Sequence, residues 1–307
     1  MEHSVATATN KPGNRRSAHR YALLGLWLLS CCVASAQSRD TLQLAQRVLP
    51  QAQVEIYKQT GPTDLRASII YPPDNQPGKT YPALVFFFGG GWVRGRVTQF
   101  EKACHYFADR GMITIAFDYR VSSRQQTTPF EAVQDARSAM RWVRKNASRL
   151  GIQPDRIVAA GGSAGGHLAL ATAVLDLIDE PGEDQSVSTR PSALVLMNPV
   201  TKTTVGGYGY ERLGDRAESL SPVAHIRPGI PPTILFHGEA DTTVPIQNAE
   251  EFCERMQAAG NRCELHRFAG QKHGFFNANQ ELNQQIIDLT DQFLTRLGYL
   301  LPKTNTK

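Results

Sequence analysis

No apolar run in this sequence is long enough to cross a lipid bilayer. The run near the start, residues 21–29, falls well short of the ~20 residues that a spanning helix requires. Basic residues are spread along the chain, and residues 1–36 supply +3 of the formal charge of +5. Nothing in this pattern indicates a nucleic-acid partner. Repeats and low-complexity tracts are absent after residue 36, and 307 residues at 41% hydrophobic can bury a substantial core.

The first 36 residues have the layout of a signal peptide. Arginines precede the apolar run 21–29, and the small residues 34–36 form a cleavage site before Gln37. We therefore expect residues 37–307 to form a single domain of an exported protein, periplasmic or secreted, with no stable membrane span after processing. Two alternatives stay open, namely an uncleaved anchor and a lipoprotein attached through Cys31.

Cysteine is scarce, with five in the whole chain. Cys31 and Cys32 would leave with the leader, so an odd number remains: Cys104, Cys253 and Cys263. In an exported protein an odd count indicates one pair and one leftover thiol. Cys253 and Cys263 flank a short turn and form the plausible disulfide; two buried thiols are the alternative.

Apolar runs and longer amphipathic runs alternate along the body. A hairpin over 53–58 and 65–71 comes first, and the remaining strands are expected at 83–88, 112–118, 156–160, 193–197, 233–237 and 263–268. Helices are expected at 97–110, 131–150, 164–177, 247–259 and 280–297. Continuous apolar strands separated by helices predict a mostly parallel sheet with helices on both faces. The stretch 199–232 lacks a long helix, so it forms either the rim of a substrate cleft or a plain surface loop.

A serine flanked by glycines marks the most informative turn. Ser163 lies within Gly161-Gly162-Ser163-Ala164-Gly165, directly after the expected strand 156–160 and before a helical run. A serine on such a strand–turn–helix is held in a strained conformation with its hydroxyl exposed above the sheet. This pattern is typical of a catalytic nucleophile, and also of a simple glycine-rich turn.

A nucleophilic serine requires a histidine base and an acid that orients the base. His273 follows the last expected strand and fits the base. His237, His266 and His167 lie on strands or on the helix after Ser163, so we expect them to be structural. Asp241 follows the strand 233–237 and fits the acid, with Glu239 as its rival in the same loop. No metal or organic cofactor is implied.

An oxyanion requires unobstructed backbone N–H groups. Gly89-Gly90-Gly91 follows the expected strand 83–88, so Gly90 and Gly91 would donate from one side and Ala164 from the other. Three independent elements at the carboxyl ends of strands, in the order serine, aspartate, histidine, favour a hydrolase.

Residues 81–276 resemble the α/β-hydrolase esterases, above all the bacterial acetyl-xylan and feruloyl type and the hormone-sensitive-lipase-like esterases. The motifs are Phe88-Gly89-Gly90-Gly91-Trp92, Asp118-Tyr119-Arg120, Asp135-Ala136-Arg137, Arg141-Trp142-Val143, Gly161 to His167, His237 to Pro245 and His273-Gly274-Phe275. The resemblance implies an α/β-hydrolase fold with a minimal cap. It also implies the triad Ser163, Asp241 and His273, with oxyanion donors Gly90, Gly91 and Ala164.

Two positions depart from that family pattern. Phe88 stands where a histidine usually precedes the glycines, and Gly162 stands where the lipase-like branch has aspartate. The second departure favours the sugar-ester branch. Trp92, Tyr208 and Tyr210 are candidates for the substrate pocket, with simple packing as the alternative for Trp92. Asp118-Tyr119-Arg120 is expected to pack and form ion pairs behind the glycine loop.

The sequence thus predicts a serine carboxylesterase that hydrolyses short-chain or sugar-linked esters, acetyl or feruloyl, through an acyl-enzyme. Its partner would be a small-molecule or polysaccharide-borne ester. A prolyl-oligopeptidase-like peptidase would use the same triad, and a non-catalytic binding module on the same fold is a second alternative.

Overall fold

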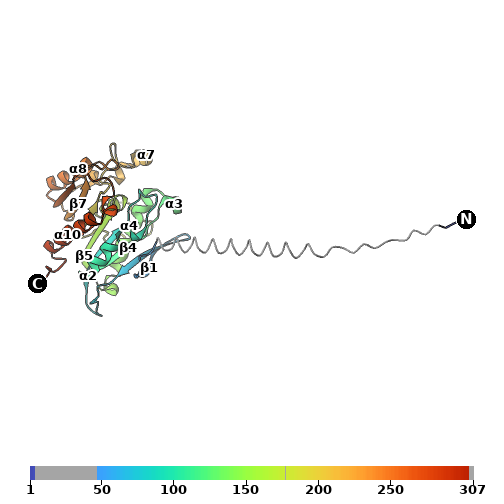
Figure 1. The fold of residues 1–307 in the computed structure, drawn as a ribbon, viewed down its shortest axis with the longest axis horizontal. Helices are drawn as coiled ribbons and strands as arrows, with labels where there is room; N and C mark the ends of the chain where they lie inside the picture. Colours follow the sequence, from blue (N-terminus) through green and yellow to red (C-terminus); the bar gives the residue numbers. More distant parts are fainter. Residues whose placement is uncertain (4–46, 177, 304–307) are drawn as a thin grey trace. The chain divides into compact units, whose positions relative to one another are not determined.

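The computed structural model describes residues 1–3, 47–176 and 178–303. From residue 47 onward they form one unit around an eight-stranded sheet of order β1-β2-β4-β3-β5-β6-β7-β8 (Figure 1). The strands are β1 Gln53–Thr60, β2 Thr63–Ile70, β3 Tyr81–Phe87, β4 Ile113–Phe117, β5 Ile152–Gly162, β6 Ala193–Met197, β7 Thr233–Gly238 and β8 Cys263–Phe268. The first two strands pair antiparallel, β2 runs antiparallel to β4, and all other pairs are parallel. The predicted mostly parallel sheet is confirmed.

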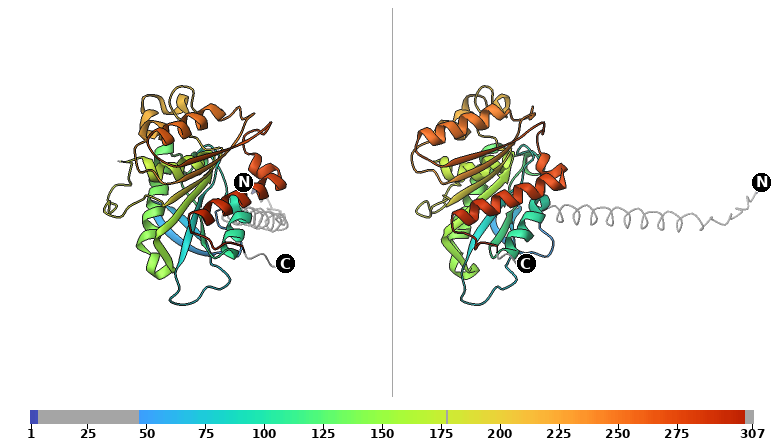
Figure 2. Two further views of the ribbon diagram at one scale, coloured as in Figure 1. Left: turned by 90° about the vertical axis from the view of Figure 1, so that its left-hand side faces the viewer. Right: turned by 60° about the vertical axis from the view of Figure 1, so that its left-hand side comes forward.

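The principal helices are α2 Glu101–Asp109, α4 Pro129–Lys145, α5 Ala147–Leu150, α6 Ala164–Val174, α8 Ile246–Ala258 and α10 Gln280–Arg296. In Figure 2, α2 and α10 lie side by side on one face of the sheet, while α4 and α6 cover the opposite face. An ion pair at 2.6 Å between Arg110, the residue after α2, and Asp291 of α10 joins α2 to α10. Helices on both faces are therefore confirmed, and they explain why β3, β4 and β6 are buried along their whole length.

Helix boundaries differ from the predicted ones where capping decides them. The helix expected from residue 131 begins earlier, at Pro129, because Thr128 and Glu131 form a reciprocal capping box and Pro129 occupies the first turn. It ends at Lys145, and a separate short helix follows Asn146. The segment expected as one helix from residue 97 starts as a 3-10 turn, η1 Val97–Phe100, before α2.

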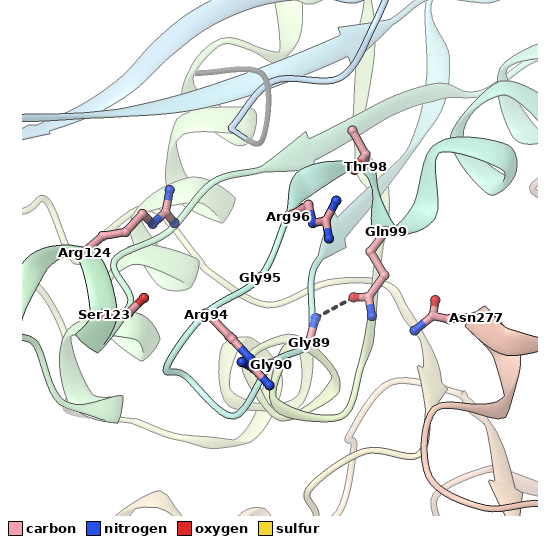
Figure 3. Close-up of a pocket in the computed structure, with 10 residues that line it drawn as sticks. All are labelled: Gly89, Gly90, Arg94, Gly95, Arg96, Thr98, Gln99, Ser123, Arg124 and Asn277. Atoms are coloured by element: carbon pink, nitrogen blue, oxygen red, sulfur yellow. Dashed lines mark hydrogen bonds between the residues drawn. The ribbon is translucent and has the colours of Figure 1, made fainter. Parts of the chain in front are cut away.

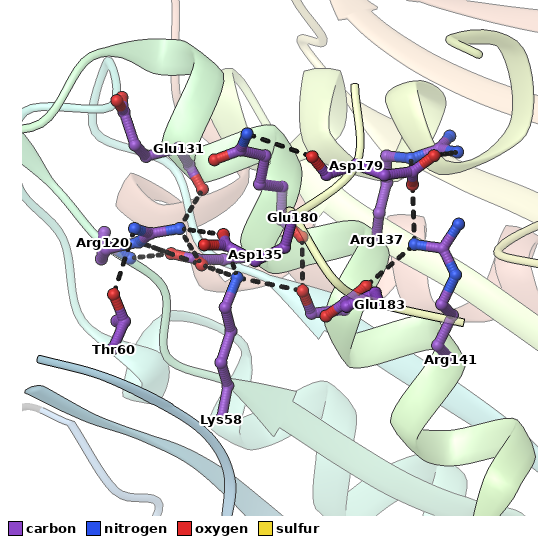
Figure 4. A network of polar contacts seen from close by, with 12 residues as sticks. Lys58, Thr60, Arg120, Glu131, Asp135, Arg137, Arg141, Asp179, Glu180 and Glu183 are labelled. Carbon is purple, nitrogen blue, oxygen red and sulfur yellow. Dashed lines mark hydrogen bonds and ion pairs between the residues drawn. The ribbon is translucent and has the colours of Figure 1, made fainter. Parts of the chain in front are cut away.

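A buried ion-pair network ties the antiparallel edge of the sheet to α4 (Figure 4). Asp135 of α4 accepts from Lys58 of β1 at 2.7 Å and from Arg120 at 2.7 Å, and both bases also contact Glu180. Removing one member of such a network leaves a buried charge unpaired, so it fixes the position of these elements relative to each other. Arg120 therefore has the structural role that the sequence predicts.

The connection between β6 and β7 contains only short elements: α7 Tyr210–Leu213, η2 Gly214–Arg216, η3 Glu218–Leu220 and η4 Pro222–His225. The lack of a long helix there agrees with the sequence. A further short helix, α9 Phe275–Ala278, precedes α10, and α3 Ser122–Gln125 follows β4. The predicted leader, with Cys31 and Cys32, lies outside the described residues apart from residues 1–3. No described helix is long and apolar enough to cross a membrane.

Candidate active site

The turn at Ser163 holds the serine in a backbone conformation that L-residues rarely adopt. Ser163 has φ 53° and ψ −119°, and its backbone N–H donates to the carbonyl of Met197 on β6 at 2.8 Å. A Cβ on Gly161 would clash with the carbonyl of Gly165, and one on Gly165 would clash with the carbonyl of Phe87. Only glycine fits both positions, so the sequence around Ser163 is what allows β5 to turn sharply into α6.

Three predicted residues meet at the carboxyl edge of the sheet. Ser163 Oγ lies 2.8 Å from Nε2 of His273, and Nδ1 of His273 lies 2.7 Å from Oδ2 of Asp241. Asp241 follows β7 and His273 follows β8. Glu239, the rival acid, is exposed. Parallel strands bring their carboxyl ends to one edge, which explains how residues 110 apart come into contact.

Asp241 is held by several donors besides His273. Its Oδ1 accepts from the backbone N–H groups of Thr243 and Val244, both at 2.9 Å, and its Oδ2 accepts from Nδ2 of Asn198 at 2.9 Å. Burial alone would raise the pKa of this carboxyl, but hydrogen bonds from His237, His273 and Val244 outweigh it and hold the pKa well below its usual value. Asp241 therefore stays ionised opposite the histidine.

Two other histidines near the site, His237 and His167, are buried, and each contacts a backbone carbonyl. Nε2 of His237 lies 2.9 Å from the carbonyl of Val244 and 3.4 Å from Asp241 Oδ2. Nε2 of His167 lies 2.7 Å from the carbonyl of Leu220, and burial lowers its pKa to about 4. Both have the structural surroundings that the sequence predicts, and His237 also supports the acid.

The glycine loop after β3 places two backbone donors beside the serine. Gly90 and Gly91 have φ of 130° and 66°, and among the described residues their N–H groups have no acceptor. They line a cavity together with Ser163. Ala164 is the first residue of α6, so its N–H belongs to the unpaired set at a helix N-terminus. The arrangement therefore offers donors from two sides of Ser163.

The glycine loop lacks the histidine that usually precedes it in this family, because Phe88 stands at that position. Contacts from two aromatic rings and one side-chain amide hold the loop instead. The ring of Phe88 stacks on Tyr119 with centroids 4.1 Å apart, and the Tyr119 hydroxyl donates to the Phe88 carbonyl at 2.7 Å. The Gly89 N–H donates to Oε1 of Gln99 at 2.6 Å (Figure 3). The packing role predicted for Tyr119 is confirmed.

A cavity of about 390 Å³ opens at Ser163 and His273. Tyr208 lines it, as predicted for the substrate pocket. Trp92 is not part of this lining: it is 2% exposed and packs edge-on against His167, which favours the packing alternative for this residue. Its backbone has a positive φ of 60°. Tyr210 is exposed at the start of α7 and is likewise not part of this lining, so its role in a substrate pocket stays a prediction.

Away from the site, Cys253 on α8 and Cys263 on β8 form a disulfide, with Cα atoms 5.4 Å apart. Cys104 is a buried free thiol. Among the described residues, no group of three or more His, Cys, Asp and Glu side chains is arranged to hold a metal ion.

Known proteins resemble this chain over both its sequence and its fold. A family model named BD-FAE matches residues 69–192, and the prolyl oligopeptidase family model matches residues 187–298. Esterase 2 of Thermogutta terrifontis, in a structure phosphoramylated by tabun, is 46% identical with a TM-score of 0.80, covering 83% of this chain and 98% of that one. The chain belongs to the α/β-hydrolase carboxylesterases. Members of this family are serine hydrolases, in agreement with the contacts of Ser163.

Curated relatives are more distant. An esterase of Mycobacterium tuberculosis, LipC, is 28% identical over 66% of this chain and 55% of its own length. A probable isoprenylcysteine alpha-carbonyl methylesterase of Arabidopsis thaliana is 29% identical over 66% of this chain and 47% of its own length. The chain thus spans about half the length of these relatives.

Sequence reasoning missed two residues that position the site. Asn198 directly follows β6, and Ser163 and Asp241 likewise come after the strands β5 and β7. This position at the carboxyl end of a strand was the signal that could have revealed Asn198. Gln99 gave no such signal, because it reaches Gly89 from a 3-10 turn ten residues further along the chain.

Proposed function

We propose that the protein is a serine carboxylesterase that works through an acyl-enzyme. The contact chain from Ser163 through His273 to Asp241, at 2.8 and 2.7 Å, carries this proposal. Ser163 Oγ attacks the ester carbonyl while Nε2 of His273 takes its proton, and the tetrahedral intermediate expels the alcohol, which receives that proton. Water then attacks the acyl-serine with His273 again as base, and the acid leaves as Ser163 Oγ regains its proton.

The backbone donors of Gly90, Gly91 and Ala164 would stabilise the negative oxygen of both intermediates. Losing one such donor typically costs ~3 kcal/mol of transition-state stabilisation. The ionised carboxylate of Asp241 would fix the tautomer of His273 and stabilise the imidazolium that forms in each step.

The substrate that we propose is a short-chain or sugar-linked ester, with an acetyl or feruloyl acyl group. Three observations support it: the cavity at Ser163 is open, Phe276 and Tyr208 provide aromatic walls, and the connection over it has no helix longer than the four residues of α7. Structures of the Thermogutta terrifontis esterase are described as bound to propionate and to butyrate, which are short acyl products.

A Ser163→Ala variant tests the proposed reaction. We expect kcat for a short-chain aryl ester to fall at least ~10⁴-fold, because the nucleophile is lost while the fold is kept. Ser186→Ala, at an exposed loop serine, is the matched control and should keep full activity. A panel of acetyl, butyryl, octanoyl and feruloyl esters with acetylated xylan then defines the substrate. Full hydrolysis by Ser163→Ala would contradict the proposal.

The prolyl oligopeptidase match over residues 187–298 favours a peptidase as the second candidate. The same triad would serve ester hydrolysis and peptide hydrolysis, so the two candidates are distinguished by which substrate the protein hydrolyses faster. We expect kcat/KM for an acetyl ester to exceed that for a proline-containing amide by orders of magnitude. The reverse order would assign the chain to peptide hydrolysis.

We further propose that the protein is exported after removal of residues 1–36. The Cys253–Cys263 disulfide supports an oxidising compartment, where such bonds persist. N-terminal sequencing of the processed protein should begin at Gln37. A blocked N-terminus at Cys31 would instead show a lipoprotein.

A further inference from the structure

Three adjoining cavities form a groove along the glycine loop. The cavity at Ser163 shares Gly89, Gly90, Arg94, Gln99 and Asn277 with a larger one of about 650 Å³ (Figure 3). A third cavity of about 380 Å³ shares Gln99 and Asn277 with both. The groove therefore extends from the cavity at Ser163 past Gln99 and Asn277 into two further cavities.

Basic side chains alone supply the formal charge of this groove. The cavity linings contain Arg94, Arg96, Lys102 and Arg124, and no aspartate or glutamate lines any of the three. We call these three cavities with their four basic residues the basic groove. Glu101 and Glu281 neighbour it in sequence but are not part of the lining.

Three of the four basic side chains, those of Arg94, Arg96 and Lys102, form no ion pair with the residues that the structure describes. Among the residues that the structure describes, Arg94 and Arg96 form no ion pair and no side-chain hydrogen bond, and both are exposed. Arg124 pairs with Asp118 at 2.7 Å, but Asp118 also accepts from Arg47, so one carboxylate faces two guanidinium groups. A cleft lined by charge of one sign attracts ligands of the opposite sign.

We propose that the basic groove binds a carboxylate carried by the ester substrate itself. This inference rests on the proposed esterase function and narrows its substrate to anionic esters. Guanidinium groups match a carboxylate in geometry as well as charge, and Arg94 lines the cavity that contains Ser163, so the charge would bind within reach of the scissile ester. The neutral amides of Gln99, Asn277 and Asn283 suit the hydroxyls of a sugar, which points to an ester on an acidic carbohydrate.

The test compares esters that differ at one group, a carboxylate in one member of each pair and an uncharged group in the other. On the acyl side, mono-4-nitrophenyl adipate is paired with 4-nitrophenyl hexanoate; on the alcohol side, 4-acetoxybenzoate is paired with 4-acetoxybenzamide. We expect the anionic member of at least one pair to have a kcat/KM at least about tenfold higher at low salt, with the preference shrinking at high salt. A response of the alcohol-side pair fits an ester on an acidic carbohydrate, whereas a response of the acyl-side pair alone would overturn that assignment and place the carboxylate on the acyl group.

Variants then connect the preference to the groove. Arg94→Gln and Arg96→Gln should each lower the anionic-to-neutral ratio about threefold, and the double variant about tenfold, as for exposed ion pairs. Arg94→Lys should restore most of the ratio. Arg190→Gln, at an exposed arginine with no ion pair among the described residues, is the charge-matched control and should leave the ratio unchanged.

Hydrolysis of the neutral esters reports on the proposed function separately. One contradicting result is that wild-type protein hydrolyses the neutral esters without preferring the anionic member of either pair; another is that the anionic-to-neutral ratio of kcat/KM is the same in the double variant. Either result would show that the inference about the groove is wrong, while the esterase proposal stands. If no ester is hydrolysed at all, the proposed function fails, and the inference that depends on it fails as well.

Discussion

Single residues around Asp241 show that the acid is held by more than the histidine that it orients. Asn198 donates from Nδ2 to the same Oδ2 that contacts His273, and two backbone N–H groups occupy Oδ1. Hydrogen bonds to a charged group contribute about 1.5–3 kcal/mol each. Asn198 is therefore a positioning residue, acting on the reaction through Asp241 and His273.

An Asn198→Ala variant tests this role. We expect kcat to fall roughly tenfold with little change in KM, because the carboxylate loses one donor and the histidine becomes less well oriented. Asn146→Ala, which removes a helix-end hydrogen bond to Trp142 far along α4, is the control. Steady-state kinetics on a short aryl ester measure both parameters. An unchanged kcat would show that Asn198 only fills space.

His167 makes stability depend on pH. Burial lowers its pKa from 6.5 to about 4, so between these values the unfolded chain binds a proton that the folded chain does not. The stabilising contribution is fully present above pH 6.5 and is lost as pH falls toward 4. From this group we expect the free energy of unfolding to drop by about 2 kcal/mol between pH 7 and pH 5.

Urea unfolding at the two pH values, on wild type and His167→Gln, measures that drop. The variant should be less stable at pH 7 because Leu220 loses its partner, yet its stability should vary less with pH. An equal pH dependence in both proteins would assign the effect to other groups.

At the scale of elements, the turn between β5 and α6 is matched to the aromatic pair above it. A Cβ on Gly162 would lie 2.5 Å from the ring of Phe276, and Phe276 stacks on Phe100 with centroids 5.9 Å apart. Glycine at this position thus leaves room for a cavity wall. This packing is a physical reason why glycine, and not the aspartate of the lipase-like esterases, stands directly before Ser163.

Gly162→Ala should displace Phe276 and raise KM several-fold, with loss of up to ~3 kcal/mol of stability from overpacking. Adding Phe276→Leu should recover part of both losses, since the two positions are in direct contact. Kinetics and urea unfolding of the single and double variants form the test. Strictly additive effects would contradict the proposed contact.

The disulfide links α8 to β8 across a turn. Replacing both cysteines with alanine should lower the free energy of unfolding by about 2–3 kcal/mol, as expected for a short closed loop. Chemical denaturation of wild type with and without reductant, beside the double variant, measures it. Non-reducing peptide mapping should find Cys253 linked to Cys263 and Cys104 free; a bond involving Cys104 would contradict the structure.

On the scale of the whole molecule, the fold was predictable because the central strands β3, β4 and β6 are bounded apolar runs, and the sheet then fixes which loops converge. That reasoning placed Ser163, Asp241 and His273 at one edge. It left the role of Trp92 open between pocket and packing, because sequence pattern does not reveal a positive φ or the direction of the side chain; the structure buries that side chain against His167. The basic groove was also hidden, since it requires the loop with Arg94 to meet the segment with Asn277 in space.

The central claim is that Ser163 is a nucleophile activated by His273 and Asp241. Labelling the intact protein with an active-site phosphonate, followed by mass spectrometry of the digested peptides, tests it most directly. The account predicts one adduct per chain, located on Ser163, absent in Ser163→Ala and strongly slowed in His273→Ala. No adduct, or an adduct on another residue that abolishes ester hydrolysis, would contradict it.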